Sequence, residues 1–234
     1  MSRFPRYLVP GLLLGLSACA HHPEHPSAHT PVHDPAAHHS SEMPHRFENA
    51  EEWAQRFEEP GREAWQKPDE VVKALALPAD AKVADVGSGT GYFAVRLARA
   101  VPQGKVYGVD IEPDMARYLG ERAKREGLSN LEPVLATAED TKLPEPVDLV
   151  LIVDTYHHLG DRVAYLRRLG ERLTRGGRVA VVDFREDSDK GPPAKHKLSA
   201  EQVREELVAA GYAPVQAYDF LPDQYFLVFQ HQRP

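Results

Sequence analysis

The chain of 234 residues has very little cysteine and no excess of positive charge. Its single cysteine, Cys19, excludes an intrachain disulfide and a metal cluster bound by several thiolates. The formal net charge is −7 at pH 7. Nucleic-acid binding requires a basic surface that neutralises phosphates, so this charge disfavours a nucleic-acid partner.

The apolar run near the N-terminus is too short to span a bilayer comfortably. It extends from Leu8 to Leu16 and follows two basic residues, Arg3 and Arg6. A basic stretch, a short apolar core and small residues in that order predict a secretory signal peptide over residues 1–19.

The end of this signal, Leu16-Ser17-Ala18-Cys19, resembles the bacterial lipobox. The resemblance implies cleavage before Cys19 and lipidation of that residue, so that the mature protein is anchored in the bacterial cell envelope. Ala20 is not acidic, which favours the outer membrane. The alternative is an uncleaved apolar tail or a misassigned start, which would leave the protein in the cytoplasm.

Residues 20–45 are rich in histidine, proline, alanine and serine and poor in large apolar side chains. Such a segment cannot bury enough apolar surface to offset its ordering entropy, so a disordered linker is predicted. Weak binding of Zn, Cu or Ni by its histidines is the alternative, but no fixed ligand spacing is visible, which favours a spacer. These histidines are His21, His22, His25, His29, His33, His38, His39 and His45.

The remaining residues carry an alternation of strand and helix patterns. Residues 46–78 predict two or three short helices, broken at Pro60-Gly61 and Pro68. Residues 79–234 predict a mostly parallel sheet with helices on both faces and a C-terminal antiparallel hairpin. The predicted strands cover 82–86, 105–110, 132–135, 147–153, 178–184, 213–220 and 224–230. The predicted helices cover 92–101, 113–127, 159–174, with Gly176-Gly177 as its C-cap signal, and 199–211.

A glycine turn follows the first of these strands and precedes a helix. Gly87, Gly89 and Gly91 leave the backbone open to a ligand, and the helix N-terminus favours a polar or negatively charged one. Their spacing differs from the dinucleotide pattern G-x-G-x-x-G. The turn also lacks the Gly-Lys-Ser/Thr of phosphate-loop NTPases, which excludes that class.

Two carboxylates flank this turn. Asp85 precedes the glycines and suits a ligand with an ammonium group. Asp110 ends the next strand, where its carboxylate can accept hydrogen bonds from both hydroxyls of a ribose. The pattern therefore favours an amino-acid nucleoside over a dinucleotide.

Several motifs in this order resemble the class I S-adenosylmethionine-dependent methyltransferases, over about residues 46–234. The resemblance implies their Rossmann-like α/β fold, with a mostly parallel seven-stranded sheet, and S-adenosylmethionine as cofactor. The motifs that carry it are Val83–Gly91, Val106–Asp110, Leu143-Pro144 with Val147–Val150, and Leu173–Val179.

The resemblance also implies a cofactor site. The methionine part would bind Asp85 and the backbone of the glycine turn, the ribose would bind Asp110, and the adenine would pack on Ile111. Many members carry an aspartate where this chain has Thr137, so a residue of that segment would have to meet the adenine amino group. The implied cofactor-binding residues are Asp85, Gly87, Ser88, Gly89, Gly91, Asp110, Ile111, Thr137, Ala138, Glu139 and Asp154.

Tyr156, His157 and His158 follow the fourth strand of the domain and are the candidate catalytic residues. A neutral imidazole accepts a proton, and a tyrosine ring stacks on a substrate or faces a sulfonium. The alternative is that one histidine caps the next helix and Tyr156 packs in the core. No third ligand is evident beside the two histidines, so no metal site is predicted. Lys195 and His196 belong either to a mobile lid or to a solvated loop.

Taken together, these patterns predict a lipid-anchored S-adenosylmethionine-dependent methyltransferase with an unidentified small-molecule acceptor. Export conflicts with a cofactor that is made in the cytosol. The alternative is therefore a non-catalytic envelope lipoprotein that binds a nucleoside-like ligand or a metal.

Overall fold

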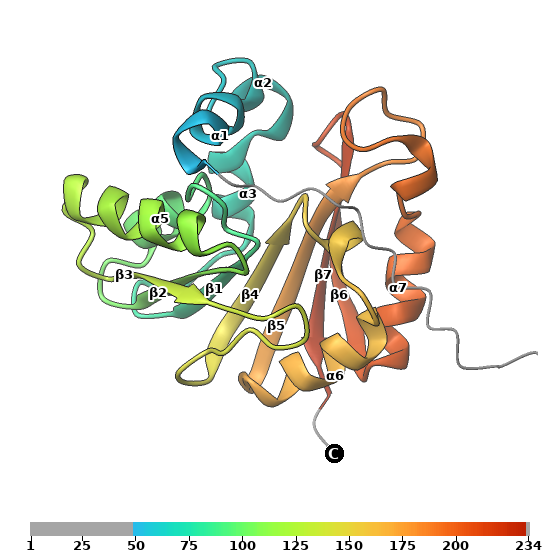
Figure 1. Ribbon diagram of the computed structural model, residues 1–234. Helices are drawn as coiled ribbons and strands as arrows, with labels where there is room; N and C mark the ends of the chain where they lie inside the picture. The colour runs from blue at the N-terminus through green and yellow to red at the C-terminus, as the bar shows by residue number, and fades with distance from the viewer. Residues whose placement is uncertain (1–48, 233–234) are drawn as a thin grey trace, which may run out of the picture. The chain divides into compact units, whose positions relative to one another are not determined.

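A computed structural model describes residues 49–232 of the chain (Figure 1). The predicted signal peptide, the predicted linker, Cys19 and the eight linker histidines lie outside the described residues. Among residues 49–232, no helix is both long enough and apolar enough to cross a bilayer.

Seven strands form one sheet in the order β3-β2-β1-β4-β5-β7-β6, which confirms the predicted fold class. The first five strands pair in parallel, and β7 pairs antiparallel with both β5 and β6. The central strand β4 is buried over most of its length, as its β-branched run predicts. The strands are β1 (Lys82–Val86), β2 (Lys105–Asp110), β3 (Leu131–Leu135), β4 (Val147–Val153), β5 (Leu173–Phe184), β6 (Tyr212–Tyr218) and β7 (Gln224–His231).

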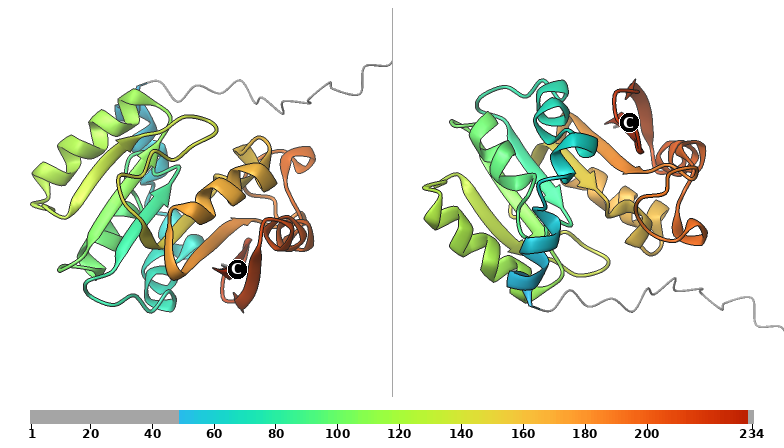
Figure 2. Two further views of the ribbon diagram at one scale, coloured as in Figure 1. Left: turned by 90° about the horizontal axis from the view of Figure 1, so that it is seen from below. Right: turned by 90° about the horizontal axis from the view of Figure 1, so that it is seen from above.

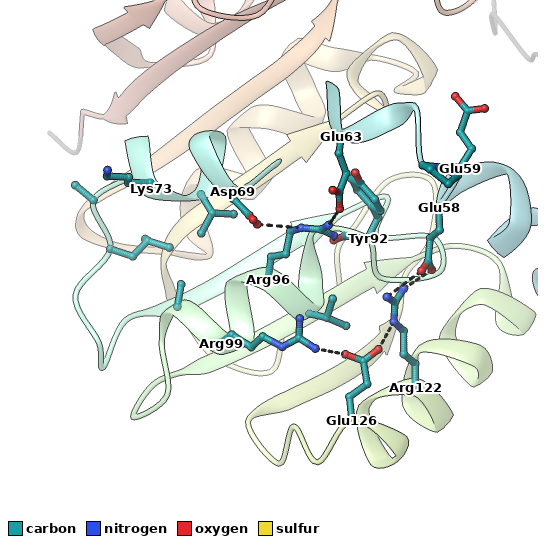
Figure 3. Close-up of a pocket in the computed structure, with 16 residues that line it drawn as sticks. Glu58, Glu59, Glu63, Asp69, Lys73, Tyr92, Arg96, Arg99, Arg122 and Glu126 are labelled. Carbon is teal, nitrogen blue, oxygen red and sulfur yellow. Dashed lines mark hydrogen bonds and ion pairs between the residues drawn. The ribbon is translucent and has the colours of Figure 1, made fainter. Parts of the chain in front are cut away.

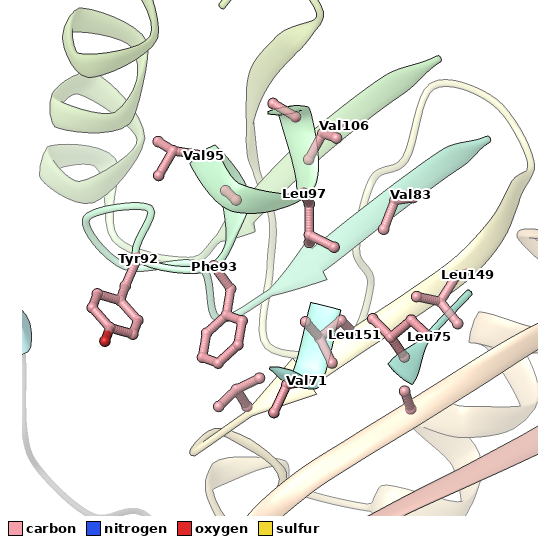
Figure 4. Packing of buried hydrophobic residues seen from close by; sticks show 14 of the residues in the cluster. Val71, Leu75, Val83, Tyr92, Phe93, Val95, Leu97, Val106, Leu149 and Leu151 are labelled. Carbon is pink, nitrogen blue, oxygen red and sulfur yellow. The ribbon is translucent and has the colours of Figure 1, made fainter. Parts of the chain in front are cut away.

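Helices cover both faces of the sheet, and the sheet separates two layers of the apolar core. Val71 and Leu97 belong to one apolar cluster (Figure 4). Leu119 belongs to the same cluster, and Leu166 and Leu207 belong to the other. The first layer packs under α3 (Pro68–Ala74), α4 (Ala94–Ala100) and α5 (Pro113–Arg125), and the second under α6 (Arg162–Glu171) and α7 (Ala200–Ala209).

The prediction was wrong about the region between α6 and β5. The helix ends at Glu171, and the strand already begins at Leu173. Gly176-Gly177 is therefore not a helix C-cap but part of an irregularity inside β5, where Val147 pairs with Leu173 and Leu149 with Arg178. Gly176 has a φ of 81°, a conformation that glycine adopts without strain, so the glycine signal belongs to a bulge.

The start of α6 also lies later than predicted. A short 3₁₀ helix, η1 (Tyr156–His158), replaces the first part of the predicted helix. The α-helix begins at Arg162 because the side chain of Asp161 accepts the Ala164 N–H at 3.2 Å and caps it. The same loop places both histidines at the carboxyl end of β4.

The N-terminal segment forms three short helices, within the predicted two or three: α1 (Ala50–Phe57), α2 (Arg62–Gln66) and α3. Pro68 begins α3, where its missing N–H is not needed. The view from above shows α1 and α2 crossing in front of the carboxyl ends of the strands (Figure 2). We call residues 49–67 the N-terminal strap.

Candidate active site

The glycine turn is tied to β2 by backbone hydrogen bonds. Gly87 N and Ser88 N both donate to Val109 O, at 2.8 and 3.1 Å. All three glycines have positive φ, with values of 73°, 50° and 93° along the turn. A Cβ on Gly87 would lie 2.2 Å from Thr155 Oγ1, so the loop after β4 packs directly against the turn. Glycine is therefore required here by conformation as well as by space.

The outer side of the turn is covered by the N-terminal strap. A Cβ on Gly89 would lie 3.3 Å from the ring of Phe57. Ser88 Oγ is buried and has no hydrogen-bond partner within the described residues. A buried polar atom without a partner in a native structure points to a ligand or water that satisfies it.

Asp110, the predicted ribose-binding carboxylate, is fixed at the mouth of the turn by backbone hydrogen bonds. Its two oxygens accept the N–H groups of Gly89, at 2.8 Å, and of Glu112, at 3.0 Å. Burial raises the pKa of Asp110, whereas these backbone N–H groups lower it. Each carboxylate oxygen has a further lone pair, so both can still accept a hydroxyl.

Two exposed apolar side chains lie beside Asp110. Ile111, the predicted adenine contact, is 55% exposed. Leu135 is 51% exposed and pairs with Asp110 across β2 and β3. Leu135 was not predicted from the sequence, because only the strand register shows that it reaches the same edge.

Asp85 lies beneath the turn and is 3% exposed. Burial and, after it, the charge of Asp110 raise the pKa of Asp85 to about 7, whereas the charge of Arg62 and the Ala94 N–H act to lower it. A buried carboxylate of this kind is stabilised by a cation, so the site fits an ammonium group.

The predicted adenine segment is exposed and follows β3. Thr137 N donates to Asp140 O at 3.0 Å, and Thr137 Oγ1 accepts Asp140 N at 3.2 Å, which closes a turn that also contains Ala138 and Glu139. Ala136 N donates to Asp110 O at 2.8 Å. The segment thus lies next to Asp110, and its contact with an adenine stays a prediction.

Asp154, a further predicted cofactor residue, holds the N-terminal strap to the sheet. Its carboxylate accepts Gln66 Nε2 at 2.9 Å and Arg62 Nη2 at 3.3 Å, and it also accepts Gln224 Nε2. Burial raises the pKa of Asp154 to about 6, and the charge of Arg62 opposes that rise. Arg62 and Gln66 were not predicted, because nothing in the pattern of a short polar helix marks them as buried.

Tyr156, predicted as catalytic, is fully buried in the second core layer. Its hydroxyl donates to Glu206 Oε2 at 2.8 Å, and Arg162 Nε donates to the same oxygen at 2.7 Å. Burial is the main cause that raises the pKa of Tyr156. This placement matches the alternative in which the tyrosine packs in the core.

His157 forms a close pair with Asp183, which ends the apolar run of β5. Its Nδ1 lies 2.9 Å from both carboxylate oxygens of Asp183. Asp183 is 2% exposed and also accepts the backbone N–H groups of His157, at 3.2 Å, and Phe184, at 2.8 Å. The His158 ring lies 4.2 Å from the His157 ring. The one sequence signal for Asp183 was a charged residue in an otherwise apolar strand.

No group of three or more histidine, cysteine, aspartate or glutamate side chains within residues 49–232 is placed to hold a metal ion. Lys195 and His196 lie in a second 3₁₀ helix, η2 (Ala194–His196), which has no buried residue.

A groove of about 890 Å³ lies along α4, between α2, α3 and α5 (Figure 3). Its charged side chains are largely paired, with Arg96 bound to Glu63 and Asp69, and Glu126 bound to Arg99 and Arg122. Neither His157 nor Asp110 lines this groove, so it is separate from the site at the carboxyl edge.

Residues 77–217 match the profile of a family described as methyltransferase domain. The 27-O-demethylrifamycin SV methyltransferase of Amycolatopsis mediterranei is 30% identical over 154 residues, covering 64% of this chain and 54% of its own. An uncharacterized methyltransferase of Mycobacterium tuberculosis is 39% identical over 103 residues, covering 44% and 50%. The chain thus spans about half the length of these two curated relatives.

A crystal structure of an S-adenosylmethionine-dependent methyltransferase from Aquifex aeolicus superposes with a TM-score of 0.71. It is 26% identical in sequence, and the match covers 76% of this chain and 97% of that one.

Proposed function

The chain belongs to the methyltransferase domain family, and on that premise we propose that it transfers a methyl group from S-adenosylmethionine to a hydroxyl of a small-molecule acceptor. The observation that carries the cofactor assignment is the pair of carboxylates at the glycine turn, of which Asp85 is buried and Asp110 partly buried. Asp85 suits the ammonium of the cofactor, and Asp110 suits its ribose.

The rest of the cofactor would lie along the same edge. The backbone of Gly87–Gly91 would face the methionine part, with Ser88 Oγ available as a polar partner. Ile111 and Leu135 would contact the adenine with their exposed apolar side chains. Thr137, Ala138 and Glu139 would lie at the far end of the adenine.

When bound, S-adenosylmethionine supplies an activated methyl group on a sulfonium sulfur. The protein therefore has to align the acceptor, exclude water and, where the acceptor carries a proton, remove it. The strap covers the turn with Phe57 and so contributes to the exclusion of water.

His157 is the group that we assign to proton removal. Asp183 accepts a hydrogen bond from Nδ1, which fixes the tautomer with a lone pair on Nε2. The acceptor proton would move to Nε2 as the O–C bond forms, while the C–S bond breaks with its electron pair remaining on sulfur. A hydroxyl needs such a base, because the neutral O–H is a poor nucleophile.

A small acceptor is supported by the name of the Amycolatopsis relative, which acts on a 27-O-demethylated rifamycin. That name also specifies oxygen as the methylated atom in the relative. An activity screen of the purified protein with hydroxyl-bearing small molecules would identify the acceptor.

Calorimetry of the full chain with S-adenosylhomocysteine, the demethylated product, tests the cofactor site. We expect binding at micromolar concentrations, and loss of binding in Gly89→Val because its side chain would meet Phe57. Gly160→Val is the matched control, since a Cβ on Gly160 meets no atom within 4 Å. Absence of binding by the wild-type protein would defeat the proposal and favour a non-catalytic protein.

We further propose that Cys19 is lipidated and anchors the protein in the cell envelope, with the outer membrane favoured. The support is the order of basic residues, apolar core and lipobox-like segment. Membrane fractionation of Cys19→Ala is the test, and an unchanged membrane-bound fraction would contradict the anchor.

A further inference from the structure

The first helix of the N-terminal strap, α1, is fastened to α5 by a network of charged groups. At the start of α1, Glu51 Oε1 lies 2.8 Å from Arg117 Nη2, and Asp114 Oδ2 accepts the Ala50 N–H at 2.7 Å. Asp114 also lies 2.8 Å from Arg117. The ion pair that crosses between the two helices lies at the surface, since the side chains of Arg117 and Glu51 are 43% and 57% exposed.

A second ion pair fastens the other end of α1. Arg122 binds both carboxylate oxygens of Glu58, with Nη2 at 3.1 Å from Oε2 (Figure 3). The same guanidinium donates to Thr90 O at 3.1 Å, inside the glycine turn. Arg122 therefore joins the end of α1 directly to that turn. We call the two ion pairs between α1 and α5, Glu51 with Arg117 and Glu58 with Arg122, the latch.

Apolar burial adds little to this attachment. Of the eight residues of α1, two are buried, and both are alanines, Ala50 and Ala54. Alanine removes little apolar area from water, so its burial stabilises a contact only weakly. Phe57, whose ring covers Gly89, is partly exposed. The ion pairs therefore decide how firmly α1 is held, and ion pairs at a surface weaken as salt screens them.

The second helix of the strap, α2, is attached in a different way. Gln66 is fully buried and donates to the Asp154 carboxylate at 2.9 Å. Residues 58–61 join the two helices, and a hydrogen bond from Arg62 Nη1 to Phe57 O, at 2.7 Å, spans this joint. Since buried contacts hold α2 and surface charges hold α1, α1 can move about the joint while α2 stays in place.

We propose that α1 is a lid over the glycine turn and that the latch holds it shut, so that ionic strength sets the fraction of molecules with an open lid. Control of cofactor entry by this lid rests on the proposed function, whereas the opening itself is a property of the ligand-free protein. The strap lies outside residues 77–217, where the family profile matches, so the latch is a feature of this chain.

Two glutamates of the α5 segment provide matched controls, because they bind the same arginines from within their own helix. Glu121 lies 3.0 Å from Arg117 Nη1, and Glu126 lies 2.7 Å from Arg122 Nε. Each is four residues from its arginine, a spacing that places both side chains on one face of a helix. Glutamine at both positions removes the same number of charges from the same two arginines and leaves the latch in place.

The test is hydrogen–deuterium exchange of the backbone amides of α1 in the ligand-free, full-length protein. A detached helix of eight residues is barely stable in water, so these amides exchange when the lid opens, and their rate reports the open fraction. We expect the rate to rise about fivefold between about 20 mM and about 500 mM KCl, as salt screens the latch. The amides of α4, a helix whose apolar side chains are buried, should be unaffected and so verify that the domain stays folded.

Glu51→Gln/Glu58→Gln should exchange in α1 about fivefold faster than wild type at low salt, and should respond less to added salt. Glu121→Gln/Glu126→Gln should behave as wild type does. Wild-type exchange that is independent of salt, or equal acceleration in the two double variants, overturns the latch.

Stopped-flow release of S-adenosylhomocysteine tests whether the lid gates the site. We expect release from Glu51→Gln/Glu58→Gln to be faster than from wild type by a factor similar to that seen in exchange. Unchanged release with accelerated exchange overturns the lid over the glycine turn. A wild-type protein that does not bind S-adenosylhomocysteine overturns the proposed function, and the exchange experiment then decides on the latch by itself.

Discussion

The two halves of the sheet's carboxyl edge differ in the groups that form them: backbone groups in one and side chains in the other. At β1 and β2 the site consists mainly of backbone, with the glycine turn, its N–H groups and the carboxylates of Asp85 and Asp110. At β4 and β5 it consists of side chains that meet from distant parts of the chain, with His157 bound to Asp183 and Asp154 bound to the strap. A backbone site holds one ligand shape, whereas a side-chain site is changed by single substitutions. On the proposed function, the β1–β2 half would hold the cofactor and the β4–β5 half the acceptor, so the cofactor half would suit a whole family and the acceptor half this protein.

Asp183→Asn is expected to have the largest effect, because it should reduce catalysis and leave cofactor binding unchanged. The amide can donate to Nδ1 and so favours the tautomer with the proton on Nε2, which removes the base. We expect a loss of kcat on the order of 10³-fold with an acceptor found by screening. S-adenosylhomocysteine should bind to the variant as tightly as to wild type.

The tautomer can be measured without an acceptor. Nitrogen-15 shifts of the histidine rings should report a proton on Nδ1 of His157 in the wild type and a changed state in Asp183→Asn. An unchanged His157 spectrum in the variant would show that Asp183 does not orient the ring.

Asp85→Asn is expected to alter the pH dependence of stability in the ligand-free protein. The folded-state pKa of Asp85 is raised from 3.8 to about 7, so folding favours its protonated form. Wild-type stability then falls as the pH rises through this window, by up to about 4 kcal/mol at 1.36 kcal/mol per pH unit. Asp85→Asn should lack this fall, and urea denaturation at pH 4, 6 and 8 measures the difference.

Asp114→Asn is the control for that experiment and should show the opposite sign. The Ala50 N–H and Arg117 lower the pKa of Asp114, so its charged form stabilises the fold above its ordinary pKa. The variant should therefore be less stable than wild type above about pH 4, by an amount that no longer changes between pH 6 and pH 8. Parallel pH curves for the two variants would contradict the assignment of Asp85.

Asp110→Ala should weaken S-adenosylhomocysteine binding by about 100-fold, because two charge-assisted hydrogen bonds to the ribose are lost. The effect should appear in calorimetry as a lower affinity with the fold intact. Glu112→Ala is the neighbouring control, since only the backbone N–H of Glu112 contacts Asp110. Equal losses in both variants would place the ribose elsewhere.

The smallest effect is expected from Tyr156→Phe. The change removes one hydrogen bond to Glu206, which remains bound to Arg162, so we expect a loss of about 1 kcal/mol in the free energy of unfolding. Methyl transfer should be unchanged. A large drop in kcat with normal stability would restore Tyr156 as a catalytic residue.

The fold, and the meeting of the glycine turn with Asp110 at one edge of the sheet, could be predicted from the sequence because their signals are local. The strands β1, β2 and β4 were predicted with the bounds that the structure shows, since each is a short, valine-containing and mostly buried segment that ends at a turn. The predicted helix C-cap at Gly176-Gly177 was wrong, because a glycine pair occurs at a β-bulge as readily as at a helix end.

The acceptor half resisted prediction because its contacts join residues far apart in the chain. His157 and Asp183 are separated by 26 residues, and Asp154 lies 92 residues from Arg62 and 88 from Gln66. No pattern within a window of a helix or strand records such pairs. Only the pairing of β4 with β5, together with the crossing of the strap, brings them together.

The N-terminal strap also carries the tryptophans that give the protein its intrinsic fluorescence. The chain contains two tryptophans, and both belong to this segment, Trp53 on α1 and Trp65 on α2. Trp53 lies 5.3 Å from the Phe57 ring that covers Gly89, and Trp65 lies 5.8 Å from the ring of Phe184. Tryptophan emission thus arises from the cover of the site alone, and unlabelled protein can report the arrival of a ligand beneath it.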